Sequence, residues 1–405
     1  MAVGKDFFPK MYPVPGFKLG VSSAGIKSLR KKDLIIMEMI EGSTIGGAFT
    51  KNSFCAAPVQ LTKKYMYSTE SRYLVTNTGN ANAGTGELGR KNAEAICQSL
   101  GHIAGVNKEA VLPFSTGVIG EHLPIQKIIA ALPSAYSSLS EDGWNIAAMS
   151  ILTTDTRPKG ASVQLEFGGK KITITGISKG SGMIRPDMAT MLAYIVTDII
   201  IDKQLIKEIV SNAVDTSFNR ITIDGDMSTN DSAILVATGA SRVNLSELSD
   251  IDQNKFLSCL NDLFLSLACQ VVQDGEGATK FVTVNVSSGR TQSECLKVAY
   301  SIAESPLVKT ALFASDPNWG RILAAIGRSG LPNLKVEDVE VYLDDVLIAD
   351  QGGRASSYME NLGQAVMSKD FLSINVILNR GDLAGTVYTT DLSHDYIKIN
   401  SEYRS

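Results

Sequence analysis

The chain has 405 residues, 44% of them hydrophobic and 20% charged, with a formal net charge of −4. This composition is that of a globular protein with a large core, and at this length two lobes are the default expectation. The negative net charge argues against a nucleic-acid-binding protein, because phosphate binding needs a basic surface.

The few cysteines and histidines exclude further classes of site. The five cysteines have no CxxC spacing, and the three histidines have no ligand partners close in sequence. Neither a zinc site nor a serine–histidine triad is therefore expected. We expect reduced cysteines in a cytoplasmic protein without a signal peptide or a membrane span.

The first half of the chain predicts strands that alternate with helices. A glycine-rich turn is predicted at Gly46 and Gly47, and two glycines at 168–169 separate the strands of a predicted hairpin. The predicted strands are 33–40, 73–76, 111–120, 161–167 and 170–176, and the predicted helices are 88–100 and 143–150.

The second half has the same mixed pattern, so the sequence predicts an α/β fold. A helix is expected after Asp202, which would cap it, and another at 256–272, where the apolar residues follow one face. The polar run 224–231 resembles a calcium loop but lacks the glutamate at the twelfth position. Predicted strands are 191–196, 232–238, 281–286, 339–343, 346–349, 372–378, 385–390 and 396–399, with a further helix at 360–368.

The stretch from Lys179 to Leu192 is the most informative part of the chain. It begins as a glycine-rich loop, turns at Pro186 and enters an apolar strand, with Thr190 at the join. A threonine hydroxyl becomes a nucleophile when its own α-amine serves as the base, which requires a cut between Ala189 and Thr190. The simpler alternative is a β-branched residue that opens a strand, since Ala-Thr also occurs at two other places.

Two other polar turns have both a functional and a plain interpretation. Residues 115–120 end a predicted strand with hydroxyls and glycines, and such a turn can present an oxyanion site or be an ordinary turn. Glu276 lies between Gly275 and Gly277, where it is either a ligand contact or a solvated turn residue.

The stretch 179–192 reads Lys-Gly-Ser-Gly-Met-Ile-Arg-Pro-Asp-Met-Ala-Thr-Met-Leu. It resembles the signature of the ornithine acetyltransferase (glutamate N-acetyltransferase) family at every fixed position. The resemblance implies a two-lobed mixed α/β fold of the DmpA-like type, with the active site between the lobes. It also implies self-cleavage between Ala189 and Thr190, giving an α chain of residues 1–189 and a β chain of residues 190–405. Arg185 and Asp187, which flank Pro186, are expected to pair with each other.

The same resemblance assigns roles along the rest of the chain. Thr190 would be the nucleophile, with the Thr116 hydroxyl and the Gly117 N–H as the oxyanion site. The implied substrate contacts are Thr153, Lys179, Thr190, Glu276, Asn400 and Ser405.

The implied reaction transfers an acetyl group from N2-acetyl-L-ornithine to L-glutamate, as in the cyclic route of arginine biosynthesis. It would be a ping-pong reaction through acetyl-Thr190, without cofactor or metal, in an α2β2 heterotetramer. Acetyl-CoA is a further candidate acetyl donor. Two alternatives stay open: an amidohydrolase or aminopeptidase that uses the same nucleophile with water as acceptor, and a nucleotide-binding module in which 179–182 is a phosphate loop.

Overall fold

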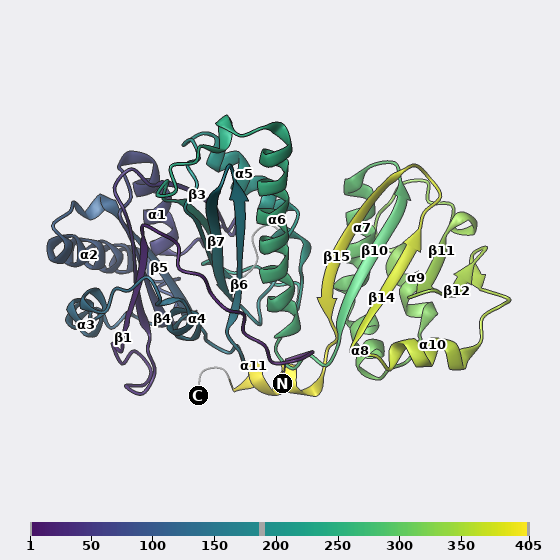
Figure 1. The fold of residues 1–405 in the computed structure, drawn as a ribbon. Helices are drawn as coiled ribbons and strands as arrows, with labels where there is room; N and C mark the ends of the chain where they lie inside the picture. Colours follow the sequence, from purple (N-terminus) through teal and green to yellow (C-terminus); the bar gives the residue numbers. More distant parts are fainter. Residues whose placement is uncertain (1, 186–190, 403–405) are drawn as a thin grey trace.

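The computed structural model describes residues 2–185 and 191–402 (Figure 1). They form a mixed α/β fold with three sheets, as the sequence predicts. Two of the sheets stack in one lobe, and the third forms a second lobe beside helix α6 (Figure 1). The predicted cleavage site, Ala189 and Thr190, and the predicted contact Ser405 lie outside the described residues.

The four-stranded sheet of the first lobe has the order β1-β2-β4-β5, and only β4 and β5 are parallel. Helices pack on one of its faces and contact β1, β2 and β5. The strands are β1 (Phe17–Ser22), β2 (Leu34–Met39), β4 (Tyr73–Asn80) and β5 (Val111–Val118), and the helices are α1 (Ala57–Ser68), α2 (Gly86–Ala104) and α3 (Ile125–Ser137). The short helix α4 (Trp144–Ser150) follows α3.

The five-stranded sheet of the first lobe has the order β3-β9-β8-β7-β6. Its strands are β3 (Thr44–Phe49), β6 (Lys159–Phe167), β7 (Lys170–Lys179), β8 (Leu192–Thr197) and β9 (Ser232–Ala237), and α5 (Leu205–Asp215) and α6 (Asp250–Gln273) pack against it. Strands β3, β6 and β7 precede the predicted cleavage site, whereas β8 and β9 follow it. The two predicted chains therefore share one sheet.

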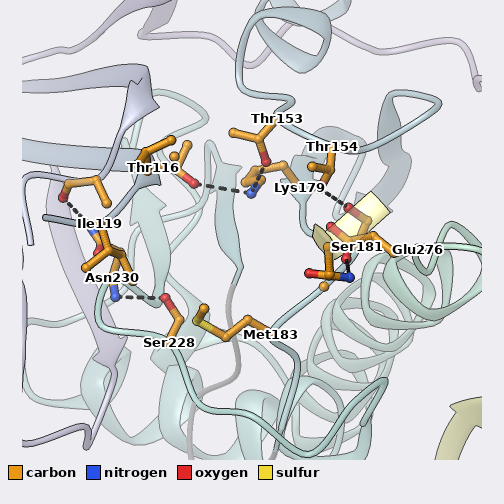
Figure 2. Close-up of a pocket in the computed structure, with 15 residues that line it drawn as sticks. Thr116, Ile119, Thr153, Thr154, Lys179, Ser181, Met183, Ser228, Asn230 and Glu276 are labelled. Carbon is orange, nitrogen blue, oxygen red and sulfur yellow. Dashed lines mark hydrogen bonds between the residues drawn. The ribbon is translucent and has the colours of Figure 1, made fainter. Parts of the chain in front are cut away.

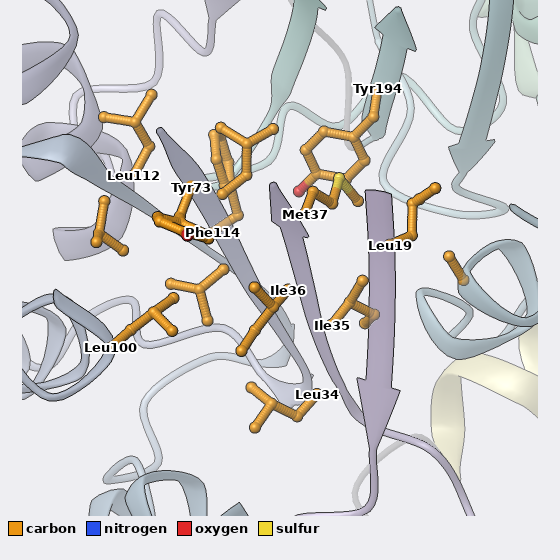
Figure 3. Packing of buried hydrophobic residues seen from close by; sticks show 14 of the residues in the cluster. Leu19, Leu34, Ile35, Ile36, Met37, Tyr73, Leu100, Leu112, Phe114 and Tyr194 are labelled. Atoms are coloured by element: carbon orange, nitrogen blue, oxygen red, sulfur yellow. The ribbon is translucent and has the colours of Figure 1, made fainter. Parts of the chain in front are cut away.

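Strand β8 is apolar throughout because both of its faces are buried. Leu192, Tyr194 and Val196 join the core between the two sheets, and the alternate residues of β8 pack toward α5 and α6. The Tyr194 ring meets Phe114 of β5 edge-on with centroids 5.4 Å apart, so the two sheets interlock here (Figure 3).

The second lobe is built on a six-stranded sheet of order β13-β12-β11-β14-β10-β15. Its strands are β10 (Phe281–Gly289), β11 (Glu340–Leu343), β12 (Val346–Asp350), β13 (Gly353–Arg354), β14 (Phe371–Ile377) and β15 (Leu383–Thr390). Its helices are α7 (Gln292–Ala303), α8 (Pro306–Phe313), α9 (Trp319–Gly327) and α10 (Glu360–Met367). The last helix, α11 (His394–Ser401), leaves this lobe and lies beneath α6 (Figure 1).

Several local predictions were wrong. Gly46 and Gly47 lie within β3 rather than in a turn. Helix α5 packs closely on β3 at Gly46, where an added Cβ would lie 2.8 Å from the Ile206 carbonyl oxygen, so the glycine serves close packing and not a turn. Residues 396–399 belong to α11, whose Ser393 cap accepts the N–H of Tyr396 at 3.4 Å. Asp202 is not the cap of α5, since that helix begins after Gln204 without a side-chain cap. The helices between 292 and 327 were not predicted at all.

Helix α6 is the one described helix that is long and apolar enough to cross a membrane by length and composition. Its apolar stripe, which includes Phe256, Phe264 and Leu267, is buried in the core beside the five-stranded sheet. The same composition is therefore accounted for by packing inside the first lobe.

Candidate active site

The ends of β5 and β7 meet at a cavity of about 220 Å³ (Figure 2). Of the predicted site residues, those that the structure describes all line this cavity, which brings together five separate stretches of the chain. They are Thr116, Gly117, Thr153, Lys179, Glu276 and Asn400. A cavity of this size suits a ligand as small as an amino acid.

The predicted oxyanion pair lies at the end of β5. Gly117 has φ +132°, and an added Cβ would lie 2.3 Å from the Gly79 carbonyl carbon and 2.5 Å from the Asn80 nitrogen. Only glycine therefore allows β5 to approach β4 this closely. The Thr116 hydroxyl oxygen accepts a hydrogen bond from Lys179 Nζ at 3.2 Å, which leaves the hydroxyl proton for another acceptor.

Lys179 is the last residue of β7 and not part of a loop, contrary to the sequence prediction. Its buried Nζ donates to the Thr116 hydroxyl and, at 2.9 Å, to the Thr153 hydroxyl (Figure 2). Burial lowers the pKa of the Lys179 amine, and the nearby Asp155 carboxylate opposes that effect. One buried cation thus joins two of the predicted contacts.

A buried ion cluster that the sequence did not reveal supports Lys179. Lys159 Nζ lies 2.7 Å from Asp155 and 2.6 Å from Asp274, and all three side chains are fully buried. Asp155 also accepts the N–H groups of Thr153 at 3.0 Å and Gly180 at 2.7 Å. Although burial acts to raise the pKa of Asp155, the charges of Lys159 and Lys179 hold that pKa below its ordinary range.

Glu276 faces the cavity from the loop that follows α6. Its N–H donates to the Ser181 carbonyl at 2.7 Å, and its Oε2 accepts from Asn400 Nδ2 at 2.8 Å. A Cβ on Gly182 would lie 2.4 Å from the same Oε2. Glu276 is only 8% exposed, so it is not the solvated turn residue that the sequence left open.

Helix α11 carries Asn400 into the site. Ser393 donates to the Gly277 carbonyl at 2.6 Å, and the Tyr396 hydroxyl donates to Asp224 at 3.2 Å. Asp224 also accepts the N–H of Met183 at 2.6 Å. These contacts fasten the C-terminal helix to two loops that line the cavity.

Further lining residues were missed in the sequence. Thr154 and Ser181 share a hydrogen bond of 2.8 Å between their hydroxyls. Asn230 (labelled in Figure 2) lines the same cavity. Its side-chain amide donates to the carbonyls of Ala81 and Ser115 at 2.7 and 2.9 Å, which fixes the loops beside β5. Short polar residues of this kind are common in loops, and only the fold brings them together.

The described residues on the two sides of the predicted cut, Arg185 and Met191, contact different parts of the chain. Arg185 Nε lies 3.2 Å from Glu304 Oε1, whereas its expected partner Asp187 lies outside the described residues. The N–H of Met191 donates to Asp231 Oδ1 at 2.9 Å. Within residues 2–185 and 191–402, no group of three His, Cys, Asp or Glu side chains is placed to hold a metal ion.

The ArgJ family model matches residues 18–405, essentially the whole chain. The chain belongs to the ArgJ family. It is 53% identical over 406 residues to the arginine biosynthesis bifunctional protein ArgJ of Pseudomonas syringae pv. tomato, and 50% identical over 407 residues to that of Psychrobacter arcticus. Both alignments cover 100% of each chain.

Solved structures also resemble parts of this ArgJ family chain. A crystal structure of ArgJ from Bacillus halodurans is 34% identical and covers 51% of this chain and 97% of its own, with a TM-score of 0.48. An ornithine acetyltransferase from Mycobacterium tuberculosis, solved with ornithine, is 29% identical and covers 43% of this chain and 92% of its own, with a TM-score of 0.40.

Proposed function

We infer that this chain is an acetyltransferase of arginine biosynthesis that moves an acetyl group from N-acetylornithine to glutamate. The observation that carries this inference is the identity of 53% over the full length to proteins named for arginine biosynthesis. The convergence of the six described contact residues on one cavity supports it, because a chance resemblance of motifs would not bring them together.

The reaction begins with a self-made nucleophile. We propose that the Thr190 hydroxyl attacks the Ala189 carbonyl and that water opens the resulting ester, which frees the α-amine of Thr190. An α-amine has an ordinary pKa of about 7.7–8.0, so it can serve as a base near neutral pH. The hydroxyl then attacks the acetyl group of N-acetylornithine and forms acetyl-Thr190.

The oxyanion of this step would be held by Thr116 and Gly117. Because Lys179 donates to the Thr116 oxygen, the Thr116 hydroxyl can direct its own proton toward the oxyanion. The charge on Lys179 also strengthens that donor. Removal of one oxyanion donor typically costs about 2.7–4 kcal/mol of barrier.

The charges of the cavity suit amino-acid substrates. We assign Glu276 to a substrate ammonium group and Lys179 to a carboxylate or to the acetyl oxygen. Glu276 keeps one carboxylate oxygen on Asn400 and can offer the other to the ligand. Ornithine and glutamate both carry an ammonium and a carboxylate, so one site can serve both halves of a ping-pong reaction.

The proposal also covers the second acetyl donor, the assembly and the cellular location. Acetyl-CoA would be a second acetyl donor, in keeping with the word bifunctional in the names of the relatives. The protein would work without metal as an α2β2 heterotetramer of cleaved chains. A cytoplasmic location fits its five free cysteines.

Intact mass under denaturing conditions tests the proposal. We expect two chains that meet between Ala189 and Thr190, with the larger chain gaining one acetyl group after exposure to N-acetylornithine. Parallel double-reciprocal lines are expected when N-acetylornithine and glutamate are varied. Intersecting lines, or acetate release at the same rate without glutamate, would contradict the transferase and favour a sequential or hydrolytic enzyme.

A further inference from the structure

The two proposed substrates carry opposite charges at the ends of their side chains. N-acetylornithine has its acetyl group on the α-nitrogen, so its one ammonium group ends the side chain. Glutamate receives the acetyl group on its α-amine, so its side chain ends in a carboxylate. The polar atoms of the two end groups lie the same number of bonds from Cα. A cavity that holds both α-nitrogens in one place therefore has to accept a cation and an anion in turn at another.

Glu276 alone cannot serve both end groups. Its carboxylate attracts the ammonium of N-acetylornithine but repels the side-chain carboxylate of glutamate, which therefore needs a hydrogen-bond donor beside it. The Asn400 amide is already in use, because its Nδ2 donates to Glu276 at 2.8 Å and to the Tyr396 carbonyl at 3.0 Å. Lys179 donates to two threonine hydroxyls and serves the α-carboxylate or the acetyl oxygen in the mechanism proposed above.

A pair of hydroxyls, on Thr154 and Ser181, lies beside Glu276 in the cavity (Figure 2). The two oxygens are 2.8 Å apart, and either hydroxyl can be the donor. The Ser181 carbonyl accepts the N–H of Glu276 at 2.7 Å, which keeps the two residues together. Ser181 is 1% exposed, and among the described residues neither hydroxyl has a further hydrogen-bond partner.

The hydroxyl pair is one of three contacts that join the same two stretches of chain. The Thr153 hydroxyl accepts from Lys179 Nζ at 2.9 Å, and Asp155 accepts the N–H of Gly180 at 2.7 Å. Both of these contacts include a charged group, so their direction is fixed. The hydroxyl pair is neutral, so its direction can reverse while the neighbouring contacts hold it in place.

This neutrality suits a subsite that takes both charges. A hydroxyl has one proton to donate and two lone pairs that accept. Two hydroxyls that bond to each other therefore leave one proton and further lone pairs for a ligand. The hydroxyl pair can donate to a carboxylate, or rotate and accept from an ammonium group, without a change in its own charge.

We propose that the Thr154–Ser181 hydroxyl pair is the subsite for the side-chain end of both substrates, an inference that rests on the acetyl transfer proposed above. When N-acetylornithine is bound, its ammonium group lies on Glu276 and donates to the hydroxyl pair. When glutamate is bound, the pair donates its free proton to the side-chain carboxylate. One cavity thereby serves both halves of the ping-pong reaction.

The test compares kcat/KM for N-acetylornithine and for glutamate in the wild type and in Ser181→Ala/Thr154→Val. Both values are expressed per cut chain, since Ser181 lies near the predicted cut. We expect kcat/KM for glutamate to fall about 10- to 150-fold, the range for loss of a hydrogen bond to a charged group. The value for N-acetylornithine should fall only about twofold, because Glu276 still holds its ammonium group.

A second hydroxyl pair, Ser162 and Thr175, provides the matched control. The two oxygens are 2.6 Å apart between β6 and β7, and neither residue is among the described residues that line the cavity. Ser162→Ala/Thr175→Val removes the same groups and should leave both values of kcat/KM unchanged.

Single substitutions keep the test decisive if Ser181→Ala/Thr154→Val is not recovered as folded protein. Ser181→Ala and Thr154→Val each leave one hydroxyl that can still donate to glutamate. Each should therefore lower kcat/KM for glutamate by about 2- to 12-fold, the range for a typical hydrogen bond, with the fall again confined to glutamate.

The other outcomes separate the subsite from the activity. Equal falls for the two substrates would overturn the proposal, because the hydroxyls would then bind a group that both share, such as the α-carboxylate. Unchanged values, or a fall for N-acetylornithine alone, would also overturn it, because glutamate would then make no use of the pair. A wild type that does not transfer acetyl from N-acetylornithine to glutamate would instead overturn the proposed function.

Discussion

Substitution of Gly182 by alanine gives a sharp test of how the cavity binds its ligand. An added Cβ would lie 2.4 Å from Glu276 Oε2 and 2.5 Å from its Cδ, so the carboxylate must move. The movement breaks the 2.8 Å hydrogen bond from Asn400 and misplaces the proposed ammonium contact. Gly182 is not among the residues with positive φ, so the alanine backbone itself is unstrained.

The size of the effect on catalysis follows from the loss of the proposed contact between Glu276 and the substrate ammonium group. A hydrogen bond to a charged group contributes about 1.5–3 kcal/mol, and each 1.36 kcal/mol is a factor of ten. We therefore expect kcat/KM of Gly182→Ala for N-acetylornithine to fall about 10- to 150-fold, mainly through a higher KM, because Glu276 would bind ground state and transition state alike.

Steady-state acetyl transfer to glutamate measures this change. Gly327→Ala is the control, since an added Cβ there meets nothing within 4 Å and the residue ends helix α9. That variant should keep its activity and gain about 0.4–1 kcal/mol of stability at most. If Gly182→Ala keeps kcat/KM within about twofold of the wild type, Glu276 does not bind the substrate in the way proposed, because the 1.5 kcal/mol at the low end already corresponds to more than tenfold.

Three further predictions concern the polar groups around the cavity. Lys159→Met leaves two buried carboxylates without their cation and should lower the free energy of unfolding by about 3–5 kcal/mol in denaturant titrations. Lys369→Met removes the cation of a partly exposed ion pair and should change the free energy of unfolding by less than about 1 kcal/mol. Equal losses in the two variants would contradict a special cost for the buried cluster. The pKa of Asp155 is lowered by folding, so its stabilisation is present above the unfolded pKa of about 3.9 and is lost as the pH falls below it. Thermal midpoints should therefore fall less steeply toward acid in Asp155→Asn than in the wild type, and parallel profiles would refute this assignment. Thr116→Val should lower kcat about 10²–10³-fold with little change in KM. An unchanged rate constant for acetylation of the enzyme in single-turnover experiments would exclude Thr116 from the oxyanion site.

Much of the site could be predicted because its residues lie in short, ordered motifs. The 179–192 signature, the turn at 115–120 and the loop around Glu276 were each recognisable in sequence, and the described members line one cavity. The apolar run of β8 and the stripe of α6 were also readable, because burial on both faces or on one face leaves a periodic pattern.

The remaining features depend on distant pairings that a single sequence does not reveal. Lys159 and Asp274 are 115 positions apart, and nothing local to either residue indicates a buried ion pair. Asp231 was read as part of a polar loop, since the N–H that it accepts is 40 positions away. Residues 396–399 alternate like a strand, and only the Ser393 cap distinguishes the short helix.

The shared five-stranded sheet changes the molecularity of folding. As one uncut chain, the protein brings β7 and β8 together by closing a short internal loop. A cut between them would make the same sheet the product of two molecules, so reassembly after unfolding would depend on the concentration of both. The mature enzyme would then persist because it unfolds slowly, rather than because it refolds readily. Each copy would be assembled once, while its two halves are still a single chain.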